Sequence, residues 1–328
     1  DLALQGDIYT NLSYALNITS SYVKRYKYSG SIEFRYEDNH TGLRNTPSFS
    51  SSNAFKFRWS HRQDSKAHPH RSFSANVNLV SSKFNQYTTN LSDYFNNTTT
   101  SSIAFSTKLG SYWNLTANLG ESYNVNTGAI SLDLPSVSVS TTQIYPFRKK
   151  KKQGKNKWYE DISLSYRVNM INKIDTYDTL LTSPDIFKSF RNGIIHSLPI
   201  QSNVKIFKHL NWTNSIDYTE RWYSNSISKT YNPATDLIDK DTIYGFIANR
   251  NANFKSSLNT RLYGMFIFKK GFIKAIRHVI NPNISFTYTP DFSDPSLGFY
   301  DFYTDKEGKR VYYSRTENGI YGSPAQGA

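Results

Sequence analysis

The sequence predicts an all-β protein, an antiparallel transmembrane β-barrel of the outer-membrane type, of which this chain forms an incomplete part with about 12 to 14 strands. Hydrophobic and polar residues alternate with period two in one segment after another. Aromatic residues make up 16% of a chain that is only 38% hydrophobic, with a mean hydropathy of -0.60. A barrel wall reconciles these values, because its strands are apolar on the lipid face and polar on the other.

The alternation is clearest in the second half of the chain. Between Phe246 and Leu262 the even positions are mostly apolar, whereas the odd positions carry Asn, Ser, Lys and Arg. The same pattern follows Leu210 and Ile162, and it occurs earlier around Phe55. A water-soluble sandwich also alternates, so the prediction depends on the repetition and on strands of about 9 to 11 residues, long enough to cross a bilayer.

Taken in order, the alternating segments predict about thirteen strands. They fall at residues 2–9, 12–22, 26–37, 53–62, 72–82, 100–109, 112–125, 129–145, 158–171, 192–208, 210–224, 244–266 and 278–290. Pro199 and Pro282 lie within strands, where each removes a ladder hydrogen bond. Weak pairing at these prolines could serve function, but we interpret it as a tolerated local defect.

The connections form two alternating sets, and barrels of this type have short periplasmic turns and longer extracellular loops. We assign the short set to the periplasm: links near Arg25, Gly110 and His209, and the segments 63–71, 146–157 and 267–277. The other set, rich in Asn, Ser, Thr and Asp, comprises 38–52, 83–99, 172–191, 225–243 and 291–328, with short members near Thr10 and Asn126.

The net charge of +14 raises the question of a nucleic-acid partner, which its distribution argues against. Many of the cations gather between Arg148 and Lys157 without interleaved aromatic residues. This basic turn includes Arg148, Lys149, Lys150, Lys151 and Lys152. We interpret it as a solvated periplasmic connection, with a binding patch for an acidic partner or phospholipid headgroups as the alternative.

The predicted inward rows are the candidate for function. They place five cations in the lumen: Lys56, Arg58, Arg167, Lys255 and Arg261. Such cations could attract an anionic amphiphile or simply hold water and partner contacts in a generic hydrated lumen.

Enzymatic chemistry is not expected. There is no Gly-x-Ser-x-Gly motif, no glycine-rich phosphate loop and no cysteine, so we predict no catalytic residues and no cofactor. His61, His68 and His70 lie close together but lack a carboxylate cluster at ligand spacing, so no metal site is predicted. His196 falls on the outward row, as an interfacial or packed residue.

Several stretches, in order and spacing, resemble the barrel part of the LPS-assembly protein LptD family. They are GDIYT at 6–10, KRYKYSG at 24–30, IYPFRKK at 144–150, RNG at 191–193, RHV at 277–279 with Pro282, and YTPDF at 288–292. The resemblance implies a translocon in the outer membrane of a Gram-negative bacterium that inserts lipopolysaccharide into the outer leaflet. It also implies as partners a lipoprotein plug similar to LptE, periplasmic bridge proteins that deliver lipopolysaccharide, and outer-membrane lipid.

The family pattern also has a periplasmic jellyroll and further strands, neither of which is expected in residues 1–328. We therefore expect an unclosed barrel segment in which residues 1–9 and 281–288 do not pair. The alternative function is a passive porin or nutrient-uptake channel, with a surface adhesin barrel as a third possibility.

Overall fold

The computed structural model describes residues 1–42, 44–81, 97–149, 154, 156–207, 209–272 and 274–327. It confirms the all-β prediction, with antiparallel strands in one large sheet. Its helices are short 3-10 turns: η1 (Trp158–Asp161), η2 (Asp178–Leu180), η3 (Ile186–Ser189) and η4 (Pro295–Leu297). Within the described ranges, none is long and apolar enough to cross a membrane.

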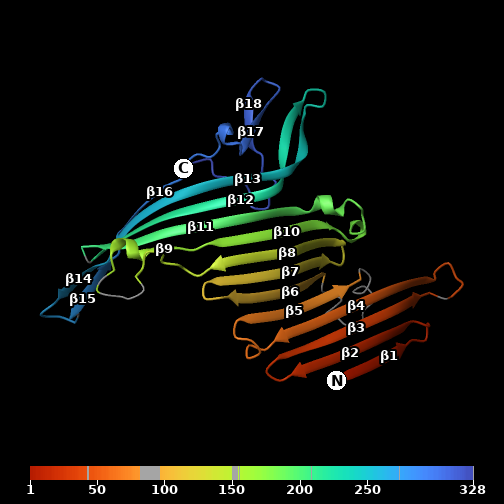
Figure 1. Ribbon diagram of the computed structural model, residues 1–328. Helices are drawn as coiled ribbons and strands as arrows, with labels where there is room; N and C mark the ends of the chain where they lie inside the picture. The colour runs from red at the N-terminus through yellow and green to blue at the C-terminus, as the bar shows by residue number, and fades with distance from the viewer. Residues whose placement is uncertain are drawn as a thin grey trace. The chain divides into compact units, whose positions relative to one another are not determined.

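The chain divides into two compact units, the first comprising Asp1–Val139 with Asn169–Asn192. Its strands follow one another as a meander that Figure 1 shows in red to yellow-green. They are β1 (Leu2–Ile8), β2 (Tyr14–Lys24), β3 (Tyr28–Thr41), β4 (Ser50–Gln63), β5 (Arg71–Val80), β6 (Thr98–Leu109), β7 (Trp113–Asn124), β8 (Ala129–Thr141) and β10 (Arg167–Tyr177).

The second unit comprises Ser140–Val168 with Gly193–Ala328. Its strands in the main sheet are β9 (Ile162–Leu164), β11 (Arg191–Ile206), β12 (Leu210–Asn232), β13 (Leu237–Thr260) and β16 (Asn283–Tyr288). Two hairpins stand apart from it, one formed by β14 (Leu262–Ile267) and β15 (Ala275–Ile280), the other by β17 (Tyr300–Thr304) and β18 (Arg310–Ser314). Among the described strands the order begins at β1 and ends at β16, so the sheet is not closed, as expected.

Pairing registers confirm the predicted rows. Directly opposed residues of an antiparallel pair share a face, and β12 and β13 pair Ile216 with Phe254 and Asp217 with Asn253. As far as the bulge after Tyr223, the even positions of both strands therefore form the largely apolar face and the odd positions the polar face. Polar exceptions in the even row include Asn214 opposite Ser256 and Glu220 opposite Arg250. In the first unit the pairs Phe34 with Phe57 and Glu33 with Arg58 separate the faces in the same way.

Burial is inverted with respect to a water-soluble sheet. Asn249 and Lys56 on the polar face are only 0% and 5% exposed, whereas Leu16 and Ile216 on the apolar face of interior strands are 42% and 46% exposed. Apolar burial is confined to small groups, chiefly Ala54, Val80, Tyr123, Val125 and Ile130 in the first unit. Among the residues that the structure describes, the apolar face thus lacks the protein layer that a soluble sheet requires.

The predicted strand 158–171 is wrong as a single element, because it splits into η1, β9 and β10. Leu164 pairs with Ile200, which makes Ser165 the partner of Pro199. The Ser165 amide donates to the Pro199 carbonyl at 3.3 Å, but proline has no N–H to return the bond. The predicted strand is interrupted at this pair, which forms only one of the two hydrogen bonds of a regular ladder.

Pro282 divides two further predicted strands, 244–266 and 278–290, by the same mechanism. The Thr260 amide donates to the Pro282 carbonyl at 3.2 Å, and the return bond is missing. Beyond the break, Leu262 pairs with Ile280 in the register already set by Asn259 and Asn283. The hairpin of β14 and β15 therefore continues the same ladder past a local interruption.

Strands extend into several segments predicted as loops, including 38–52 and 172–191, and most of all into 225–243 and 291–328. Segment 225–243 is largely the continuation of β12 and β13, which leaves only residues 233–236 as the connection. Segment 291–328 contains β17 and β18 around a turn at Asp305 to Lys309. Both segments are rich in polar residues, which concealed short alternating runs such as Val311 to Tyr313.

Replacing Pro282 with valine should close the break, because the new N–H can donate to the Thr260 carbonyl. One added net hydrogen bond stabilises the closed pair by about 0.5–1.5 kcal/mol. Hydrogen-exchange mass spectrometry should then show slower exchange around Arg261 and Asn281. The control Pro233→Val, in the exposed β12–β13 turn, should leave this region unchanged; equal exchange in P282V and the parent chain would contradict the explanation.

Candidate functional site

The polar face of the second unit is a continuous row of hydrogen-bonding and charged side chains. Across β11, β12 and β13 the register aligns Gln201 with Ser215 and Ser215 with Lys255. The Asn211 amide donates to Asn259 Oδ1 at 3.1 Å along the same row. Such a surface retains water and suits contact with a polar or anionic ligand.

The two cations predicted here differ in their surroundings. Lys255 lies in the middle of the polar row, opposite Ser215 and Thr287, and is exposed. Arg261 lies at the Pro282 break, where its Nε donates to Asn281 Oδ1 at 2.9 Å. The register therefore places Lys255 on the predicted face and Arg261 at its end.

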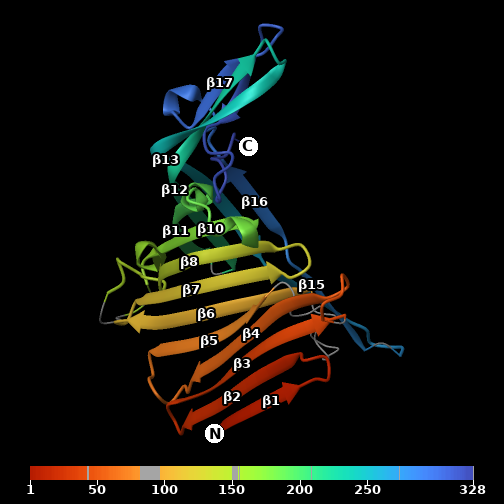
Figure 2. The same cartoon turned by 90° about the vertical axis from the view of Figure 1, so that its right-hand side faces the viewer.

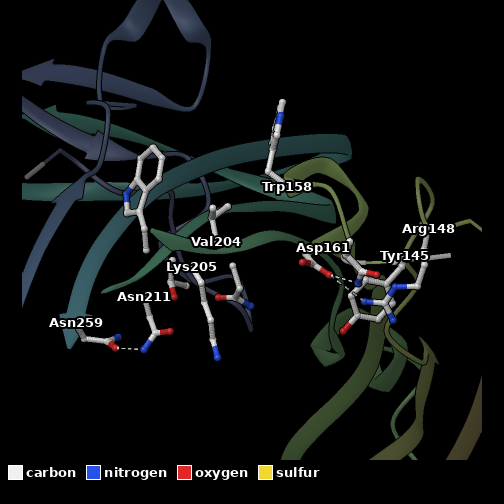
Figure 3. A pocket seen from close by; sticks show the side chains of 13 residues that line it. Tyr145, Arg148, Trp158, Asp161, Val204, Lys205, Asn211 and Asn259 are labelled. Atoms are coloured by element: carbon white, nitrogen blue, oxygen red, sulfur yellow. Dashed lines mark hydrogen bonds and ion pairs between the residues drawn. The ribbon is translucent and has the colours of Figure 1, made fainter. Parts of the chain in front are cut away.

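A cavity of about 1090 Å³ lies at the turn end of β11 and β12. Its lining combines the polar ends of the strands, including Lys205 and Asn211, with the segment that carries Arg148 and Trp158. Figure 3 shows Asn211 and Asn259 joined by their hydrogen bond, with Lys205 beside them, while Tyr145 and Arg148 lie together beside Asp161. Cationic and aromatic groups thus meet at the predicted periplasmic end.

The described part of the basic turn is partly neutralised. Arg148 stacks on the Tyr145 ring at 3.5 Å from its centroid and reaches Asp161 at 3.4 Å. Lys149 lies 4.0 Å from Glu160, a buried carboxylate that also accepts from the Lys157 amide. Lys150, Lys151 and Lys152 lie outside the described residues. The carboxylates of Glu160 and Asp161 were missed as partners of the turn because no motif in the sequence links them to Arg148 and Lys149.

A C-terminal segment covers the polar face at the opposite end of β12 and β13. We call residues 291–327 the cap; Figures 1 and 2 show it beside these strands. Buried Asn249 donates to Thr316 Oγ1 at 2.8 Å, and Arg221 Nε donates to the Tyr321 carbonyl at 3.1 Å. The backbone of Ile227 also donates to the Arg315 carbonyl at 2.9 Å.

Charges and close packing hold the cap in place. Lys229 Nζ lies 2.6 Å from Glu317, and Tyr223 donates to the Gly322 carbonyl at 2.8 Å. A Cβ on Gly319 would approach the Tyr223 ring to 2.7 Å, so only glycine fits there. Within the cap itself, burial raises the pKa of Tyr300, whose hydroxyl donates to the Pro324 carbonyl at 2.9 Å.

In the first unit, the predicted lumen cations have acidic neighbours. Arg58 lies 3.6 Å from Glu33 on the adjacent strand, and buried Lys56 is opposite Arg35, which is bonded to Glu37. The row is therefore a mixed ionic network rather than a set of free cations. Glu33 and Glu37 were missed because their partnership with the cations depends on the β3–β4 register.

Arg167, the fifth predicted lumen cation, begins β10 just after the break opposite Pro199, and it is exposed. The interrupted strand still keeps the predicted alternation around it. Ser163 is buried on the polar side, and Tyr166 on the apolar side bonds His196 Nδ1 at 2.7 Å. His196 also lies 4.1 Å from the Trp222 ring, so it is packed among aromatic groups, as predicted.

Aromatic clusters mark the apolar face in both units. In the first, Trp59 Nε1 donates to the Tyr22 hydroxyl at 3.0 Å, and His61 Nδ1 lies 2.8 Å from the same oxygen. Gly30 makes this possible, because a Cβ there would approach the Tyr22 hydroxyl to 2.3 Å. In the second unit, β12 carries Trp212 and Trp222 on this face.

These features define the class: an all-β protein built on a large antiparallel sheet with a polar, partly capped face and an exposed apolar face. A family model described as LptD protein matches residues 1–328. The chain therefore belongs to the LptD family, which assigns it a role in lipopolysaccharide transport and confirms the resemblance found in the sequence. A comparison with curated proteins finds no match.

Replacing Thr316 with valine should loosen the cap. The change removes the acceptor of the fully buried Asn249 amide, and an unsatisfied buried donor costs about 1–3 kcal/mol. Limited proteolysis should cleave 315–322 faster in T316V than in the control Thr304→Val, whose exposed side chain lies elsewhere in the cap. Equal cleavage rates would show that this bond does not anchor the segment.

Proposed function

We propose that the chain forms part of an outer-membrane translocon that inserts lipopolysaccharide into the outer leaflet. In this proposal the apolar face contacts lipid and the polar face lines the lumen. The role is transport, and the chain supplies no catalytic group.

The inverted burial of side chains is the observation that carries the proposal. A sheet in water must cover its apolar face with protein, yet Leu16 and Ile216 remain exposed while Lys56 and Asn249 are buried. Hydrocarbon is the surroundings in which this distribution is stable, because lipid solvates the apolar side chains and the lumen solvates the polar ones.

The spacing of tryptophans on β12 supports a bilayer. Trp212 and Trp222 lie on the apolar face, separated by about 33 Å of strand at roughly 3.3 Å per residue. With a strand tilt of about 40–45°, this length spans a band about 23–25 Å tall, the usual distance between the aromatic girdles of outer-membrane barrels. Trp212 would then mark the periplasmic interface and Trp222 the outer one.

The arrangement of the polar face suits an anionic amphiphile. The turn-end cavity brings Arg148 and Lys205 together with tyrosine and tryptophan rings. In the first unit, a second cavity of about 740 Å³ at the turn end is lined by Lys24, Arg25 and Arg62, among others. Cations at the predicted periplasmic end of both units would meet phosphorylated lipid delivered by periplasmic bridge proteins. An LptE-like lipoprotein is the proposed plug of the lumen.

A passive porin or nutrient channel is the second candidate. It would use the same two-faced sheet. The polar row from Gln201 to Lys255 favours a channel, because a row of polar side chains could line a water-filled path. The cap argues against it, because the cap lies on the polar face where a solute path would run. Family membership adds weight to lipopolysaccharide as cargo.

Depletion of the full-length protein in its native bacterium separates the two functions. Under the proposed function, newly made lipopolysaccharide should stop reaching the cell surface and viability should fall. A pulse-chase experiment with surface labelling measures how much newly made lipopolysaccharide reaches the cell surface. A defect confined to solute uptake, with normal surface lipopolysaccharide, would instead establish the channel.

Arginine substitutions on the two faces should differ sharply in effect. Phe254 pairs with Ile216, about midway between Trp212 and Trp222, so Phe254→Arg should destabilise the folded protein by roughly 2–4 kcal/mol, because a cation would face lipid near the bilayer midplane. Leu258 pairs with Trp212 at the proposed interface, so Leu258→Arg should cost less, about 0–1 kcal/mol. The matched changes Asn253→Arg and Asn259→Arg place the same group on the polar face and should be mild. Unfolding titrations of the full-length protein in lipid vesicles measure the difference; equal losses on both faces would refute the assigned orientation.

A further inference from the structure

The hairpin of β14 and β15, residues 262–280, is apolar on both faces. Its large side chains are exposed whichever face they belong to, with Phe266 at 63% and its sequence neighbour Ile267 at 72%. Phe272 near the tip is fully exposed. Other members of the surface are Leu262, Tyr263, Met265, Phe268, Ile276, Val279 and Ile280. Such a surface is unlike the two-faced strands of the main sheet.

The charged side chains of the hairpin are all positive. It carries Lys269, Lys270, Lys274 and Arg277, and the sequence has no acidic residue between Asp241 and Asp291. Arg277 lies over the Tyr263 ring at 4.8 Å from its centroid. The lysines gather around the tip, whereas the apolar side chains continue down both strands.

The position of the hairpin places this surface beyond the proposed bilayer. Trp212, the proposed periplasmic interface, pairs with Leu258 on β13, and the hairpin begins after that point, at Leu262. Figure 1 shows β14 and β15 projecting past the turn ends of β11 and β12. Six residues of strand at about 3.3 Å each extend it by roughly 20 Å.

Beyond the interruption at Pro282, the described strands β14 and β15 pair only with each other. A two-stranded ladder is only marginally stable in water, so an apolar surface on this projection calls for an occupant. An occupant of this surface must match apolar side chains along the strands and positive charge at the tip. A protein surface could cover the apolar part, but the unbroken positive charge favours an amphiphile with acyl chains and an anionic headgroup.

We infer that hairpin 262–280 is a contact site for the phosphorylated, acylated glycolipid cargo as it arrives from the periplasm, an inference that rests on the proposed function. Lys269, Lys270 and Lys274 meet the anionic headgroup first. The acyl chains then lie along Phe266, Phe272 and their neighbours, which guides the lipid toward the turn end of the sheet.

Photo-crosslinking in cells that express the full-length protein tests this directly. A benzophenone amino acid replaces Phe266 or Phe272 in the hairpin, or Lys255 on the polar face as a probe of the proposed function itself. Tyr112, an exposed aromatic residue of the β6–β7 turn, is the matched control at the same predicted end. We expect lipopolysaccharide adducts at Phe266, Phe272 and Lys255, and few at Tyr112.

Charge reversal supplies the second measurement. K269E, K270E and K274E together should lower the Phe272 adduct by at least about tenfold, because each lysine near an anionic lipid surface contributes about 1 kcal/mol. The triple control K188E, K306E and K309E changes the net charge equally at the loop end of the strands and should leave the adduct unchanged. Protease resistance of the sheet in each variant verifies folding.

The outcomes separate the two proposals. Adducts at Lys255 without adducts in the hairpin would overturn the hairpin inference and leave the proposed function intact. Hairpin adducts to a protein or to phospholipid would overturn it as well, by identifying a different occupant. In a correctly assembled protein, the absence of lipopolysaccharide adducts at both Lys255 and the hairpin would count against the proposed function.

Discussion

The rest of the structure depends on one constraint: a single sheet whose apolar face is largely exposed among the described residues. Polar side chains that do lie on that face bond to neighbours on the same face; Glu220, for example, accepts from Tyr218 and Trp222. Tyr22 bonds Trp59 and His61 there, and Tyr166 bonds His196, so the polar tips of aromatic residues are paired with each other. On the opposite face, Asn249 and Lys56 can be buried because their neighbours there are also polar. The sheet thus exposes apolar side chains and buries polar ones, the reverse of the distribution in a soluble fold.

Much of this was accessible from the sequence, because period-two alternation is a local signal. The rows containing Phe254 and Asn253 follow directly from it, and the β12–β13 register confirms them. Aromatic richness at low mean hydropathy predicted the two faces before any pairing was known. The position of Lys255 within the polar row was predictable for the same reason.

Other features depend on which residues become neighbours, and no local pattern encodes that. Pro199 and Pro282 were recognised as weak points, but the breaks they cause depend on their partners, Ser165 and Thr260. The counter-charges Glu33 and Glu160 were missed because their contacts with Arg58 and Lys149 require the folded chain. The cap was read as a loop because its anchors, such as Thr316 on Asn249, are far apart in sequence.

The cap is fastened to β12 partly through its own main chain. Arg221 and Tyr223 both donate to main-chain carbonyls of the cap, those of Tyr321 and Gly322. A carbonyl is present whatever side chain the residue carries. At residues 321 and 322 the path of the cap over β12 therefore does not depend on which side chains are present, whereas at Thr316 and Gly319 it does.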